Sequence, residues 1–196
     1  AGADLLYHTT YTGCTVQDNE ITEVQLYAKN GFFSVKGKIF LDCSADADLA
    51  THAGISSVYG RESDHLAQPM TMNIKVTNVD RNKVMEFVKS HRDDMLSTIP
   101  FDRLEEIPRT GIQGAYSLIK AAKSEGEFHV DRDMVLCFET NNSGEFILNM
   151  SRIIRKSAVD PFELTEAEIE GRKQAQEIVA FMRKYIPGFE NCRLEC

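Results

Sequence analysis

The dipeptide Asn30-Gly31 constrains the fold of this chain more than any other feature. It lies between Ile21–Lys29 and Phe32–Leu41, two segments rich in the β-branched and aromatic residues that favour strands. Asn-Gly between two such runs is the strongest short-range signal of a β-hairpin. A similar segment, Leu5–Thr12, comes first and is separated from the second by Asp18-Asn19. The pattern therefore predicts an antiparallel three-stranded meander near the amino terminus.

The overall composition is that of an ordinary soluble globular protein, with 42% hydrophobic and 27% charged residues among 196. A net charge of -8 argues against nucleic acid and against an anionic membrane surface as partners. No apolar run approaches the roughly 20 residues needed to span a bilayer. We therefore expect neither a nucleic-acid nor a membrane partner.

The five cysteines occur at irregular spacing and include no C-x-x-C pair. This argues against a disulfide framework and against a zinc ribbon. Reduced thiols are typical of the cytosol, so a cytoplasmic location is expected. Cys43 and Cys137 lie inside apolar runs and are predicted to pack in the core. The five histidines fall at no metal-ligand spacing, so no metal site is predicted.

The run Lys38–Ala50 predicts a strand, a turn and a short helix that continues through Gly54. Its turn carries Asp42, Asp46 and Asp48 among small residues. A calcium loop needs a glycine at its sixth position and a carboxylate at its twelfth. Neither a loop counted from Asp42 nor one counted from Asp46 has both. The simplest alternative is that Asp46 or Asp48 caps the following helix.

Alternation and helical periodicity predict the remaining elements. Asp80 is expected to cap a helix that buries Val84, Phe87 and Val88, and Thr165 to cap the last helix in a capping box with Glu168. A helix beginning just after Arg109 is read as an ordinary helix start, with anion binding as the alternative. The other predicted segments are strands Met70–Val79, Met134–Thr140 and Glu145–Ile154, and helix Gly111–Lys123.

Two catalytic signatures are missing from the sequence. No G-x-S-x-G elbow supports a serine hydrolase, and no G-x-G-x-x-G supports a primary dinucleotide loop. In a regular strand, Asn149 and Ser151 would share a face opposite Leu148 and Met150. That face is either a site that orients a substrate or simply the solvated side of a half-buried strand.

Several segments, in this order, resemble a family of prokaryotic FAD-dependent oxidoreductases of the glutathione-reductase-like flavoprotein class. The family pattern D-A-T-G-D-G-D-L-A corresponds to Asp42–Ala50, and its G-R-E to Gly60-Arg61-Glu62. The resemblance covers essentially the whole chain. Its other motifs match Asn149-Met150-Ser151-Arg152, Leu164–Gln174 and Pro187–Asn191.

The resemblance implies the interior of a longer protein, because the family's first G-x-G-x-x-G unit and a later flavin-contacting segment have no counterpart here. The opening Ala-Gly-Ala-Asp also reads as a chain cut from something longer. FAD would lie near Ser44, Ala45 and Asp46. Where the family has two glycines this chain has Ala45 and Ala47, which disfavours close approach of a cofactor.

The resemblance therefore predicts an α+β protein with three parts: a partial FAD-binding domain with the meander at 1–68, a mixed sheet-and-helix substrate domain at 69–160, and a helix returning toward the FAD domain at 161–196. Hydride transfer between flavin and an unknown small molecule would involve Asn149, Ser151 and Arg152. We expect the isolated chain to be inactive, to hold no FAD unaided and to self-associate. The alternative is a non-catalytic binding or assembly module on the same scaffold.

Overall fold

The computed structural model describes residues 2–97 and 99–195, and the chain divides into two compact units, Ala1–Gly60 and Arg61–Cys196. Helices and antiparallel sheets occur together, so the predicted α+β class is confirmed. The predicted boundaries after residues 68 and 160 remain predictions. No helix within the described ranges combines the length and apolarity that crossing a bilayer requires.

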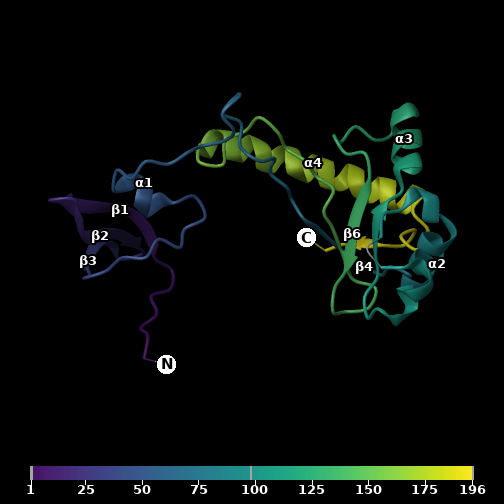
Figure 1. The fold of residues 1–196 in the computed structure, drawn as a ribbon, viewed down its shortest axis with the longest axis horizontal. Coiled ribbons are helices and arrows are strands. Elements are labelled where there is room, and N and C mark those ends of the chain that lie inside the picture. Colours follow the sequence, from purple (N-terminus) through teal and green to yellow (C-terminus); the bar gives the residue numbers. More distant parts are fainter. Residues whose placement is uncertain (1, 98, 196) are drawn as a thin grey trace. The chain divides into compact units, whose positions relative to one another are not determined.

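The first unit is the predicted antiparallel meander with strand order β1-β2-β3 (Figure 1). Asp18 and Asn19 both have positive φ, 51° and 65°, which suits a two-residue hairpin turn because it matches the twist of the strands. The Asn30-Gly31 hairpin is also confirmed, with Ala28 paired to Gly31. The elements are β1 (Thr10–Gln17), β2 (Glu20–Ala28), β3 (Gly31–Lys36) and α1 (Asp48–His52).

Two strand predictions in the first unit are wrong. The first strand occupies Thr10–Gln17 rather than Leu5–Thr12, because Thr10–Gln17 is the stretch that pairs with β2. The third strand ends at Lys36, so no strand leads into the turn at Asp42. Within the described part of the chain, residues 38–43 make no backbone–backbone hydrogen bond, and a strand cannot form without a neighbour to pair with.

The second unit is built on a five-stranded antiparallel sheet with the order β5-β6-β7-β4-β8. Central strand residues such as Val76, Cys137 and Leu148 are completely buried and form part of one hydrophobic core. Cys137 is thus a core residue as predicted, whereas Cys43 is exposed and that prediction is wrong. The strands are β4 (Ile74–Thr77), β5 (Gly111–Gly114), β6 (Val135–Glu139), β7 (Phe146–Leu148) and β8 (Arg193–Leu194).

Helices complete this core, and the long helix α4 runs beside the sheet (Figure 1). Ile178 and Met182 of α4 are fully buried in the same cluster as the sheet residues. As predicted, Asp80 caps α2 by accepting from two backbone N–H groups. The helices are α2 (Arg81–Ser90), α3 (Tyr116–Ser124) and α4 (Pro161–Tyr185), with the 3-10 turns η1 (Arg92–Asp94) and η2 (Phe101–Glu106).

Two helix starts differ from the prediction. Residues 111–114 form strand β5, because they pair with β6, and α3 begins only at Tyr116. The last helix begins at Pro161, where Asp160 accepts from the N–H groups of Phe162 and Glu163. Pro is well suited to the first helical position after such a cap. Thr165 therefore lies inside the helix and donates its hydroxyl to the Pro161 carbonyl.

Candidate functional site

The turn from Asp42 to Ala50 is organised by two of its own side chains. One Asp42 oxygen accepts from the N–H and the hydroxyl of Ser44, at 2.9 and 2.6 Å. The other oxygen accepts from the Ala50 N–H at 2.9 Å, and Ser44 Oγ accepts from the Asp48 N–H at 2.8 Å. These bonds, led by the Ser44 hydroxyl, lower the pKa of Asp42 below its usual value. The turn is folded around a carboxylate that stays ionised at neutral pH.

The expectation that Asp46 or Asp48 caps α1 is wrong. The residue preceding the helix is Ala47, whose own side chain makes no capping hydrogen bond. Asp42, outside the helix, reaches its first turn instead. Ala47 has φ +56°, a left-handed conformation that costs a non-glycine residue about 1 kcal/mol. Ala45 has no positive φ, so only one of the two alanines carries this cost.

The turn does not fit the pyrophosphate of a dinucleotide. A phosphate cradle needs free backbone N–H groups, but those of Ser44, Asp48 and Ala50 are already bonded to side-chain oxygens. The exposed carboxylate of Asp46 adds negative charge to the same turn. These residues could still accept hydrogen bonds from an uncharged, hydroxylated part of a cofactor.

A pair of aromatic side chains fixes α1 on the sheet of the first unit. The Tyr11 hydroxyl lies 3.1 Å from Nδ1 of His52, and the two rings stack with their centroids 5.5 Å apart. Burial, reinforced by a hydrogen bond with Cys14, raises the pKa of Tyr11 to about 12. The phenol therefore keeps its proton and holds α1, and the turn before it, against β1.

In the second unit, Asn149 and Ser151 do not share a solvated face. Asn149 is half-buried, whereas Ser151 is completely buried, like Leu148 and Met150. The Ser151 hydroxyl accepts from the Met72 N–H at 2.7 Å and donates to the Met72 carbonyl at 2.9 Å. This pair of bonds ties the strand-like segment after β7 to the residues before β4.

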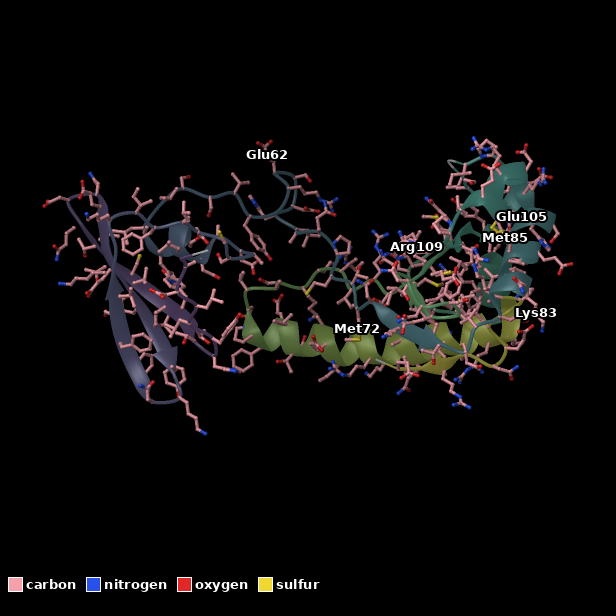
Figure 2. The ribbon with its side chains drawn as sticks, turned by 90° about the horizontal axis from the view of Figure 1, so that it is seen from below. Glu62, Met72, Lys83, Met85, Glu105 and Arg109 are labelled. Carbon is pink, nitrogen blue, oxygen red and sulfur yellow. The ribbon has the colours of Figure 1, made fainter. Side chains whose placement is uncertain are left out.

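Met72 in turn packs on α4 (Figure 2), where a Cβ on Gly171 would lie only 3.0 Å from Met72 Cε. Ser151 thus joins three segments of the unit through Met72. Its hydroxyl is engaged in positioning the backbone.

Arg152 is the predicted site residue with unsatisfied bonding capacity. Its Nε is buried without a hydrogen bond, although it forms an ion pair with the Asp131 carboxylate at 3.7 Å. The side chain as a whole is 39% exposed, so the guanidinium reaches the surface. Unpaired buried donors are rare in proteins, which makes this group a candidate for ligand contact.

Two residues that the sequence analysis did not single out hold Arg152 in place. Gln174 of α4 accepts from the Arg152 N–H at 2.8 Å and donates to its carbonyl at 3.1 Å. Arg132 donates to the carbonyls of Met150 and Ser151. Gln174 lies in the matched motif Leu164–Gln174, so its motif position was the available signal.

The predicted site residues fall into two groups on different units: Ser44, Ala45 and Asp46 in the first, and Asn149, Ser151 and Arg152 in the second. Across residues 2–97 and 99–195, no three His, Cys, Asp or Glu side chains are grouped to hold a metal ion.

Comparison with known proteins identifies the family. No curated protein matches this chain, and no solved structure matches it either. The family model described as FAD dependent oxidoreductase matches residues 1–195, nearly the whole chain. This agrees with the ordered motifs from Asp42 to Asn191 and with the strand-rich first unit. The chain belongs to the FAD dependent oxidoreductase family.

Proposed function

We propose that residues 1–196 form the interior part of an FAD-dependent oxidoreductase and do not hold FAD by themselves. The observation that carries this proposal is that none of residues 2–60 is buried. A three-stranded sheet needs a covered apolar face to be stable. The first unit exposes large apolar side chains both on this sheet, as at Phe32, and outside it, at Leu5, Leu6, Ile39, Leu41 and Val58.

The segment before the turn supports the same proposal. Ile39 and Leu41 are each 83% exposed, while Phe40 between them is half-buried. This alternation is typical of a strand, but the segment pairs with no strand in the part of the chain that the structure describes. We propose that polypeptide outside residues 1–196 supplies the neighbouring strand. Ser44, Ala45 and Asp46 would then contact the non-phosphate part of the FAD that this polypeptide grips.

For the complete protein we propose hydride transfer between a small-molecule substrate and FAD, the group that supplies the redox chemistry. Arg152 would hold a negatively charged group through its Nε, which makes no hydrogen bond, and the half-buried Asn149 would orient the substrate. Ser151 would position Asn149 and Arg152, because its hydrogen bonds to Met72 hold the segment that carries them. The apolar surface of the first unit would also make isolated chains self-associate.

A flavin titration tests the proposal. We expect the 196-residue chain to show no saturable quenching of FAD fluorescence, because three N–H groups of its turn are already bonded to side-chain oxygens. The complete gene product should bind FAD at one per chain. An FAD absorbance band that co-purifies with residues 1–196 alone would contradict the proposal.

The second candidate is a non-catalytic module that keeps the scaffold without the cofactor. The turn around Asp42 favours it, because the hydrogen bonds of the turn form within the chain itself and require no ligand. The coding sequence upstream of Ala1 and flavin binding by the complete gene product distinguish the two candidates. An in-frame G-x-G-x-x-G upstream of Ala1 supports the oxidoreductase, whereas a complete gene product that binds no flavin supports the module.

A further inference from the structure

A pocket of about 450 Å³ opens in the second unit, away from the predicted site residues. It lies where the start of α2, the loop before β5 and the loop between β6 and β7 meet. Arg81, Arg109, Asn141 and Ser143 contribute polar groups to its lining. The volume is within the range of small-molecule sites, about 300–1,000 Å³.

The buried carboxylate of Glu139 holds the pocket's walls together. One oxygen accepts from Arg81 Nε at 2.8 Å and from the Thr110 N–H at 2.9 Å. The other accepts from the Gly144 N–H at 3.2 Å. Helix α2 and both loops are thus fixed to a single side chain, so the pocket is formed before any ligand enters.

Arg109 gives the pocket its charge. Arg81 and Glu139 form an ion pair and neutralise each other. Arg109, labelled in Figure 2, lines the same pocket and forms no ion pair or hydrogen bond with any described residue. The pocket therefore keeps one net positive charge, in a protein whose net charge is -8. A guanidinium presents a planar fork of donors that matches a carboxylate.

We propose that this pocket binds a small organic anion through a single carboxylate group held by Arg109. The exposed Asn141 amide and Ser143 hydroxyl, which bond to no described residue, are additional donors. One net positive charge suits a singly charged group. A phosphate dianion would be left with excess charge beside the Glu139 carboxylate, which favours the carboxylate. The proposal is independent of FAD binding, because none of its residues belongs to the turn or to the 149–152 segment.

The test is a ¹H–¹⁵N NMR titration of the 196-residue chain with sodium acetate at constant ionic strength. Saturable shifts are expected for the amides of residues 109–110 and 141–144. Acetamide, the neutral isostere of acetate, should produce none. Arg109→Gln should weaken acetate binding by at least about tenfold, the loss expected for one charge-assisted contact.

Arg103→Gln is the matched control, because it removes the same charge from an exposed arginine outside the pocket that pairs with Glu106. It should leave acetate binding unchanged. Equal affinity in Arg109→Gln and the unmodified chain would overturn the proposal, as would the absence of saturable shifts. Tighter binding of inorganic phosphate than of acetate would overturn the carboxylate assignment.

Discussion

Gly114→Ala is expected to destabilise the second unit by about 3 kcal/mol or more, through strain and overpacking together. Gly114 has φ +143°, and a Cβ there would lie 2.4 Å from the Asp94 carbonyl oxygen and 2.6 Å from Met95 Cα. Both are backbone atoms. They are held by the bridge between Met95 and Gly114 and by the 2.7 Å bond from the Ala115 N–H to the Asp94 carbonyl. Urea unfolding followed by circular dichroism measures the loss.

Gly126→Ala is the control for this substitution. Gly126 also has positive φ, +74°, but no heavy atom lies within 4 Å of a Cβ built on it. Alanine there should cost only the left-handed conformation, about 1 kcal/mol. Equal losses for the two variants would show that the contact of β5 with Asp94 and Met95 is not as close as described.

Glu139→Gln is expected to cost about 3 kcal/mol, the lower end for breaking a buried ion pair, because Arg81 is 30% exposed. The carboxylate accepts from Arg81, Thr110 and Gly144 and donates to none of them. A glutamine amide would turn its own NH₂ toward one of these donors. The same urea titration measures the loss, and the amides of Thr110 and Gly144 should shift in NMR spectra.

Glu106→Gln is the corresponding control. Glu106 also pairs with an arginine, Arg103, but both side chains are well exposed. Exposed ion pairs contribute about 0–1 kcal/mol. A Glu139→Gln loss no larger than this would contradict the view that Glu139 holds α2 and the two pocket loops together.

The features predicted correctly from the sequence depend on local chemistry. The Asn30-Gly31 hairpin and the Asp80 cap each need only a few neighbouring residues. In each case the side chains that favour the structure lie within the element itself.

The predictions that failed depend on distant partners. Residues 111–114 read as the start of a helix, but pairing with β6 makes them a strand. Residues 38–41 read as a strand, but they make no backbone–backbone hydrogen bond with any described residue. The capping box of Thr165 and Glu168 is the exception, because a local cap, Asp160-Pro161, starts the helix about one turn earlier. Local propensity allows more than one secondary structure in such segments, and long-range strand pairing determines which one forms.

The candidate site was predictable only in part. The sequence locates the turn around Ser44, but not the way in which Asp42 occupies its N–H groups. It places Ser151 near Asn149, but a half-exposed strand cannot be told from a buried one by alternation alone. The bonds of Ser151 to Met72 and of Gln174 to Arg152 join segments 79 and 22 residues apart. Such contacts carry no local signal.

Hydrogen–deuterium exchange of residues 38–43 tests the central claim most directly. In the 196-residue chain these amides should exchange rapidly, because they have no backbone partners and Ile39 and Leu41 are exposed. In the complete gene product with FAD they should be strongly protected, as part of a paired strand leading into the Ser44 turn. Equal exchange rates in the two proteins would contradict the claim that this segment is built to be completed by further polypeptide.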